Sequence, residues 1–206
     1  MHTQSVSRLL EVDQLEIRRG EHRLVHELSF AVRPGDIIHL KGPNGSGKTS
    51  LLRCLAGLSM PDAGTIRWFG TAYRNRVGPE ARARFRFVGH LDGLKGGLDV
   101  RENLRAQQAL TGEDGDIDNA IAFVGLAGRE RVLAQRLSAG QRRRAALARL
   151  LLGNADAWLL DEPFTALDVE FVKCVGQWIA EHSASGGVTS TMSPRRSSSP
   201  DGVGGS

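Results

Sequence analysis

The chain has 206 residues, and 40% of them are hydrophobic, which is enough for one compact domain with a sizeable core. Its formal net charge is only +4, and no basic block is interleaved with aromatic residues, so the composition argues against nucleic-acid binding. The first thirty residues show no signal-peptide pattern, and no apolar run reaches membrane-spanning length. We therefore expect a cytosolic chain that meets a membrane only through a partner.

Two cysteines, Cys54 and Cys174, each lie within an apolar helical pattern. Neither has a partner at metal-ligand spacing. We expect both to be buried free thiols in a reducing compartment.

The first part of the chain has the pattern of a mixed sheet. Two segments of alternating character precede the apolar run 36–40 and predict an antiparallel pair beside a buried strand. The arginine-rich segment 73–86 is amphipathic, and we expect its charges to form the solvated face of a helix. The strands expected along the whole chain are 9–17, 23–32, 36–40, 65–70, 85–90 and 157–160. This order predicts an α/β fold with an antiparallel lobe.

The segment 42–49 spells G-x-x-x-x-G-K-T and stands between a predicted strand and a helical leucine pattern, as a phosphate-binding loop requires. Its three glycines allow positive φ angles and a close approach of the backbone to an anion. The backbone N–H groups and the positive helix end would bind the α- and β-phosphates. Lys48 would reach the β- and γ-phosphates, and the Thr49 hydroxyl would ligate Mg²⁺. The expected nucleotide-binding residues here are Gly42, Pro43, Asn44, Gly45, Ser46, Gly47, Lys48, Thr49 and Ser50.

Helical patterns dominate the middle of the chain. The range 100–110 predicts one helix, an acidic glycine-containing loop follows, and 121–126 begins another. Ser138 is a good N-cap for the arginine-rich helix that follows it, and Gly140 leaves the helix start uncrowded. This helix N-terminus could bind an anion. The segment alone is equally consistent with an ordinary capped helix.

The apolar strand predicted at 157–160 ends in two carboxylates, Asp161 and Glu162. A strand interior does not tolerate such a pair, so this strand end is expected to open onto a ligand site. Asp161 suits Mg²⁺, directly or through water. Glu162 suits a general base that polarises an attacking water.

Taken in order, these segments resemble the nucleotide-binding subunits of ABC transporters, over residues 9 to about 187. The resemblance rests on the phosphate loop, Leu-Ser-Ala-Gly-Gln at 137–141, Leu-Leu-Asp-Glu-Pro at 159–163 and Ala-Leu-Asp at 166–168. It implies an ABC-type P-loop NTPase with a mixed sheet core, an antiparallel lobe and a helical subdomain at about 90–150. It also implies that Lys48 and Glu162 are catalytic.

The same resemblance implies a head-to-tail dimer with two ATP molecules sandwiched between the subunits. Ser138, Gly140 and Gln141 of one subunit would face the γ-phosphate held by Lys48 of the other. Asp168 would lie in the loop that crosses the dimer interface.

Within this family, the chain is similar to the ATP-binding subunit of the cytochrome c maturation heme exporter. Gly-His at 89–90 stands where most members carry glutamine, and the runs 137–144 and 161–168 also match. The similarity implies that ATP hydrolysis drives integral membrane permease subunits that handle heme, at the cytoplasmic face of the bacterial inner membrane. His90 would lie between the nucleotide and the membrane partner. No pattern in the residues themselves specifies heme.

The chain departs from the family pattern at two places. No aromatic residue stands at 18–22, where the family stacks adenine, so we expect relaxed nucleotide selectivity. Pro194 stands where the family has the switch histidine that contacts the γ-phosphate, and His182 lies too early to replace it. The range 188–206 is atypical, and we expect a disordered tail and a sheet that lacks one strand.

Two alternatives to a working transport ATPase follow from these departures and from the family. One is a subunit that binds ATP but hydrolyses it poorly, because the switch histidine is missing. The other is a non-transport ABC ATPase, although such proteins usually need two nucleotide domains or a long coiled coil, and this chain has neither.

Overall fold

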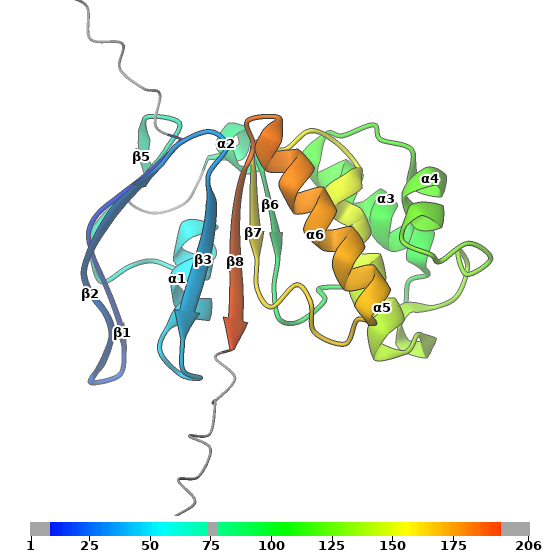
Figure 1. Ribbon diagram of the computed structural model, residues 1–206, viewed down its shortest axis with the longest axis horizontal. Helices are drawn as coiled ribbons and strands as arrows, with labels where there is room; N and C mark the ends of the chain where they lie inside the picture. The colour runs from blue at the N-terminus through cyan, green and yellow to red at the C-terminus, as the bar shows by residue number, and fades with distance from the viewer. Residues whose placement is uncertain (1–8, 74–77, 195–206) are drawn as a thin grey trace, which may run out of the picture.

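The computed structural model describes residues 9–73 and 78–194. Its strands form two four-stranded sheets, one antiparallel and one parallel (Figure 1). The antiparallel sheet has the order β2-β1-β4-β5, with the bounds β1 (Leu10–Arg19), β2 (His22–Val32), β4 (Ala63–Trp68) and β5 (Thr71–Tyr73). The parallel sheet has the order β3-β8-β7-β6, with the bounds β3 (Ile37–Gly42), β8 (Val188–Pro194), β7 (Ala157–Leu160) and β6 (Phe85–Val88).

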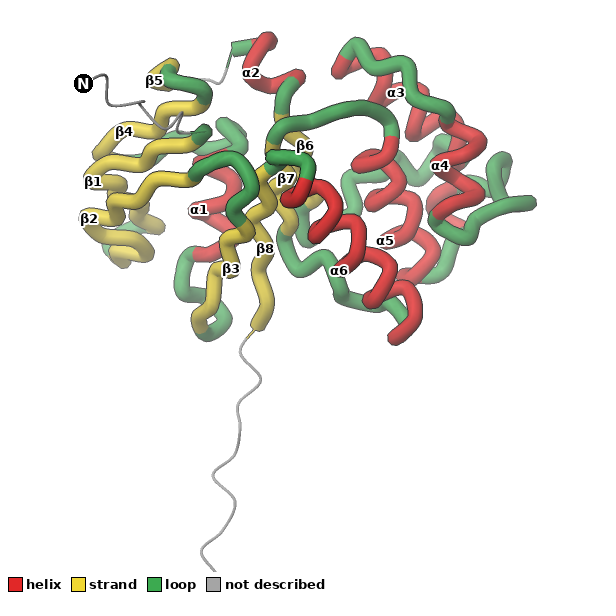
Figure 2. Tube along the Cα trace, turned by 45° about the horizontal axis from the view of Figure 1, so that its top comes forward, coloured by secondary structure: helices red, strands yellow, loops and turns green. Residues whose placement is uncertain are grey.

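The helices divide between the two faces of the parallel sheet. Helix α1 (Lys48–Leu55) lies between the two sheets, and the remaining long helices pack on the opposite face of the parallel sheet (Figures 1 and 2). These helices are α3 (Val100–Thr111), α4 (Ile117–Phe123), α5 (Ala139–Leu147) and α6 (Val169–Ala184). Short helical turns complete the set, namely α2 (Pro79–Ala83), η1 (Ala134–Arg136) and η2 (Ala148–Leu151).

Each face of the parallel sheet has its own hydrophobic core. The core between the sheets includes Leu15, Leu52 and Trp68, which are all fully buried. The core under the helices includes Leu104 and Leu147. Strand β7 is buried along its whole length, as its unbroken apolar run predicts for a central parallel strand.

The predicted loss of a sheet strand after residue 187 is wrong. Strand β8 lies between β3 and β7 and pairs in parallel with both. Two of its buried threonines have partners: the Thr189 hydroxyl lies 3.2 Å from Nδ1 of His182, and the Thr191 hydroxyl 2.7 Å from Nδ1 of His39. The buried Ser190 hydroxyl between them has no hydrogen-bond partner among the described residues. The rest of the predicted tail, 195–206, lies outside the described residues.

Two further expectations need correction. The segment 73–86 is not one solvated helix, because β5 ends at its first residue, α2 covers only part of it, and Arg86 is buried in β6. Residues 74–77 lie outside the described residues. Cys54 is buried as predicted, whereas Cys174 is exposed, because it lies on the outer face of α6.

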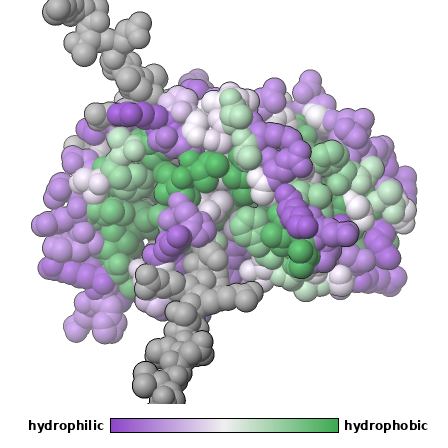
Figure 3. Space-filling model, in the orientation of Figure 1, coloured by the Kyte–Doolittle hydropathy of each residue, from purple (hydrophilic) through white to green (hydrophobic). Residues whose placement is uncertain are grey.

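Strand β3 is the edge strand of the parallel sheet, and apolar surface is visible over it and beside it (Figure 3). Ile37, at its start, is 51% exposed. None of the helices in the described part of the chain is both long and apolar enough to cross a membrane.

Candidate active site

The loop between β3 and α1 has the conformation of an anion cradle. Gly45 and Gly47 have φ angles of 82° and 87°, in the left-handed region that favours glycine. Gly47 caps α1 without a side-chain hydrogen bond, so the first N–H groups of the helix have no side-chain acceptor at the cap. Nζ of Lys48 donates to the carbonyls of Gly42 and Pro43, at 2.9 and 2.8 Å, and so folds back over the loop.

The antiparallel sheet covers one side of this loop. A Cβ atom at Gly47 would lie 2.8 Å from Cβ of Leu24 on β2, which is closer than real Cβ atoms approach. Together with its positive φ, this contact requires glycine at position 47. The loop is therefore held against β2 as well as against its own strand and helix.

Asp161 follows β7 and lies beside the same loop. It is only 1% exposed, and the Thr49 hydroxyl of the loop is close enough to affect its pKa. Burial raises the pKa of this carboxyl, the Thr49 hydroxyl opposes that effect, and the neighbouring Glu162 adds to it. Oδ2 of Asp161 is buried and has no hydrogen-bond partner among the described residues. A hydroxyl beside a buried, unpaired carboxylate oxygen is the donor chemistry that suits a hard cation such as Mg²⁺.

Glu162, the next residue, has a φ of 49°, which is unusual for a residue with a side chain. Its carboxylate is partly exposed, with Oε2 lying 3.3 Å from Nδ1 of His90 and 3.4 Å from the Thr165 hydroxyl. The sequence predicted Glu162 and His90 as separate site residues, and the structure brings them together.

Arg143 on α5 is a residue of this site for which the sequence predicted no role. It is 3% exposed, and its guanidinium donates to backbone carbonyls of two loops, one after β6 and one after β7. A signal was present in the sequence, because Arg143 precedes the apolar Ala146 and Leu147 by three and four positions. That spacing places it on the buried face of the helix.

The segment before α5 has the predicted cap. The Ser138 hydroxyl accepts from the Gln141 N–H at 3.2 Å, and Oε1 of Gln141 accepts from the Ser138 N–H at 3.0 Å. A Cβ atom at Gly140 would lie 2.8 Å from the Ala166 carbonyl oxygen, so the helix start packs closely on the loop that leads to α6. Asp168 caps α6 by accepting from the Phe171 N–H at 2.9 Å.

The structure does not bring every predicted site residue together. Within the described ranges, no hydrogen bond or ion pair joins Ser138, Gly140 or Gln141 to the loop at 42–49. The helix α5 and the loop after β3 lie on opposite sides of β7 and β8 (Figure 1). Asp168 instead forms an ion pair with Arg144 in the same subunit.

His182, which the sequence did not assign to the site, has a structural role. It stacks on Trp158 with ring centroids 4.0 Å apart, and its Nε2 donates to the Ala155 carbonyl at 2.8 Å. Burial lowers the pKa of His182, so the neutral ring can accept at Nδ1 from the Thr189 hydroxyl.

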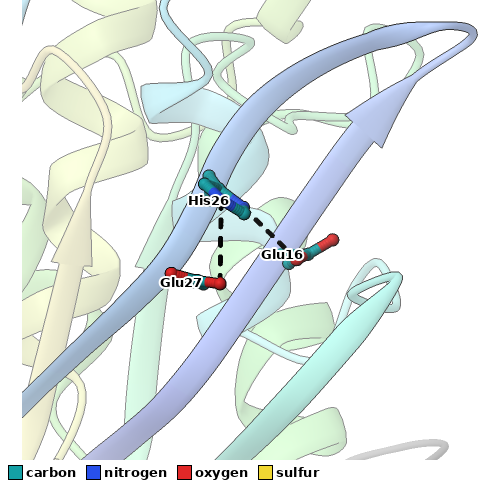
Figure 4. A group of neighbouring side chains, drawn as sticks. All are labelled: Glu16, His26 and Glu27. Carbon is teal, nitrogen blue, oxygen red and sulfur yellow. Dashed lines mark ion pairs between the residues drawn. The ribbon is translucent and has the colours of Figure 1, made fainter.

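A second group of titratable side chains lies on the β1–β2 hairpin, and the sequence did not predict it (Figure 4). Nδ1 of His26 lies 3.3 Å from Glu16, and Nε2 lies 3.8 Å from Glu27. Arg18 also pairs with Glu16, at 3.5 Å. These ion pairs are solvent-accessible and therefore contribute little to stability.

Comparisons with known proteins agree with this geometry. The family model described as "ABC transporter" matches residues 25–165. A protein of Nitrosomonas europaea named "Cytochrome c biogenesis ATP-binding export protein CcmA" is 50% identical over 183 residues, which cover 87% of this chain and 85% of the relative. A protein of the same name from Nitrosococcus oceani is 45% identical over 179 residues, which cover 87% of this chain and 82% of the relative.

Solved structures share the fold. A putative ABC transporter ATP-binding protein from Pyrococcus furiosus has a TM-score of 0.76 at 24% identity, and the match covers 92% of both chains. The ATP-binding subunit of another ABC transporter has a TM-score of 0.79 at 23% identity, covering 91% of this chain and 80% of that one.

Proposed function

This chain belongs to the ABC transporter family as an ATP-binding and ATP-hydrolysing subunit, and we propose that it powers a heme-handling exporter of cytochrome c biogenesis. The family match and the relatives named as cytochrome c biogenesis export proteins support this proposal. The observation that carries the chemistry is the arrangement of Asp161 and Glu162 at the end of β7, with Asp161 beside Thr49 of the phosphate loop and its buried Oδ2 unpaired among the described residues.

The loop 42–50 binds the phosphates of ATP in this proposal. The backbone N–H groups of the loop and the start of α1 face the anion, and Lys48 exchanges its two loop carbonyls for phosphate oxygens. Thr49 and Asp161 would hold Mg²⁺, which would neutralise part of the charge on the phosphates. Glu162 orients and polarises the attacking water, and His90 lies against its carboxylate.

The dimer completes the site from the other subunit. Among the described residues, no hydrogen bond or ion pair joins the capped start of α5 to this chain's own phosphate loop, which supports a role for Ser138, Gly140 and Gln141 at a partner's γ-phosphate. Asp168, at the start of α6, would lie at the same interface. Two ATP molecules would then be held between two head-to-tail copies.

Membrane permease subunits are the other partners in this proposal. The chain would sit at the cytoplasmic face of the bacterial inner membrane, and His90 in the loop after β6 would lie toward these subunits. A non-transport ATPase is not favoured, because the relatives reported above carry the name of an export protein.

ATP turnover of the chain assembled with its membrane subunits tests the proposal. We expect Mg²⁺-dependent hydrolysis that Glu162→Gln abolishes without loss of ATP binding, because the amide cannot accept a proton from water. Glu80→Gln, on α2, is the matched control and should retain wild-type turnover. Equal turnover in Glu162→Gln and wild type would reject Glu162 as the base, and failure to co-purify with membrane subunits would reject the transport role.

A further inference from the structure

Arg143 joins two loops that the parallel sheet leaves side by side. Its Nη1 donates to the Gly89 carbonyl at 2.7 Å, in the loop after β6. Its Nη2 donates to the carbonyls of Asp161 and Glu162, at 2.6 and 2.7 Å, in the loop after β7. Nε lies 3.4 Å from the Pro163 carbonyl. One buried guanidinium thus bonds to four backbone carbonyls.

The bonds to the second loop act on a strained residue. Glu162 has a left-handed φ of 49°, a conformation that a residue with a side chain leaves unless its surroundings fix it. Nη2 binds the carbonyl before this residue and the carbonyl of the residue itself, so it fixes the peptide units on both sides. The direction of the Glu162 carboxylate follows from the orientation of these two units.

The bond to the first loop acts on the partner of Glu162. Gly89 immediately precedes His90, whose Nδ1 lies 3.3 Å from Oε2 of Glu162. Nη1 of Arg143 also lies 3.7 Å from the Asp92 carboxylate, in the same loop. Both members of the His90–Glu162 pair are therefore held through their backbones by a single side chain.

We propose that Arg143 is a positioning residue for ATP hydrolysis, which fixes the backbones of Glu162 and His90 from helix α5. This inference rests on the proposed role of Glu162 as the base. Arg143 lies on α5, the helix that Ser138 caps, so it also connects the start of this helix to the Glu162 loop of the same subunit. A nucleotide that binds at the helix start is thereby linked to the geometry of Glu162.

A lysine cannot make this set of bonds. The guanidinium is a planar group with five donors, and here it reaches carbonyls on two loops at once, whereas an ammonium is a single point of charge. We therefore expect Arg143→Lys to lose most of the effect of Arg143, although it keeps the charge and much of the volume.

The test compares Arg143→Lys and Arg143→Met with the double variant Arg86→Met/Glu113→Leu, in the full chain assembled with its membrane subunits. Arg86 is as buried as Arg143 and also bonds to two backbone carbonyls, but at the start of β6, and replacing its ion-pair partner Glu113 as well leaves no unpaired buried charge. We expect both Arg143 variants to lose on the order of 100-fold in kcat, with an unchanged Kd for ATP. The double variant should keep the wild-type kcat.

Hydrogen exchange gives a readout that does not depend on turnover. In both Arg143 variants, amide exchange should accelerate in segments 89–92 and 161–165 and stay unchanged in the phosphate loop. Full kcat in Arg143→Lys, or unchanged exchange in these two segments, would overturn the inference. If the wild type itself is inactive, the proposed function is rejected. Accelerated exchange in the variants would in that case still support the positioning of the two loops by Arg143.

Discussion

A buried ion pair joins the parallel sheet to the helical side of the molecule, and its removal should have a large and unusual effect on stability. Arg86 lies on β6 and Glu113 in the turn after α3, with side chains 4% and 10% exposed. Arg86 also donates to the carbonyls of Ala83 and Phe85, at 2.9 and 3.0 Å. Glu113 accepts from the Thr111 hydroxyl at 2.8 Å.

The size of the effect follows from what each substitution leaves behind. Removing one partner of a buried pair costs about 3–5 kcal/mol, because the remaining charge is buried without compensation. The stability loss of Glu113→Leu should lie near the lower end of this range, since Arg86 keeps two carbonyl acceptors. The loss of Arg86→Met should lie near its upper end, since Glu113 keeps only one hydroxyl donor. The double variant should recover to within about 1 kcal/mol of wild type, because replacing both charges removes the desolvation penalty.

Urea denaturation of the wild type, the two single variants and the double variant measures this cycle. Asp156→Asn is the control, because the Arg84–Asp156 pair has a 2.7 Å contact but side chains that are 48% and 41% exposed. It should cost less than about 1 kcal/mol. The reasoning fails if the double variant loses the sum of the two single losses, or if either single variant costs no more than the control.

Three shorter predictions concern other sites. Cys174 is exposed, whereas Cys54 is buried with a pKa raised to about 11. A thiol reagent should therefore react rapidly with one thiol per chain, and Cys174→Ser should remove that fast reaction. Two fast thiols in the wild type would contradict this. Burial lowers the pKa of His182 below its unfolded value of about 6.5, so stability should be complete above that pH and fall as pH decreases. Between pH 8 and pH 5.5, the thermal unfolding midpoint of His182→Gln should fall by less than that of the wild type. An equal fall in both proteins would refute the role of His182. Pro194→His should raise ATP turnover by on the order of 100-fold, because it supplies the γ-phosphate contact that the resemblance implies at this position; unchanged turnover would contradict this.

The local structures that the sequence predicted correctly around the candidate site depend on local spacing. The glycines of the phosphate loop, the Ser138–Gln141 cap and the two carboxylates after β7 each lie within a few residues of the element that positions them. Short-range geometry of this kind is set by backbone conformation and helix capping, so a residue pattern is enough to recognise it.

The features that the sequence missed depend on contacts between distant residues. The acceptors of Arg143 lie 18 to 54 positions away, and Glu113, the partner of Arg86, follows helix α3 on the helical side of the molecule. An arginine beside apolar residues is usually solvated, and only the fold shows that carbonyls or a carboxylate surround it. The spacing of Arg143 indicates a buried helix face, but the acceptors of both arginines follow only from the fold.

Strand β8 was missed for a related reason, and it changes how the departure at position 194 should be understood. The strand is rich in serine and threonine, so its pattern indicates no core. The Thr191 and Thr189 hydroxyls are satisfied by His39 and His182, from β3 and α6. Pairing with β3 then brings Pro194 opposite Gly42, the first glycine of the phosphate loop. The unusual C-terminal sequence thus keeps the strand and its register as far as Pro194, and the departure at that position is a change of residue type and not the loss of a strand.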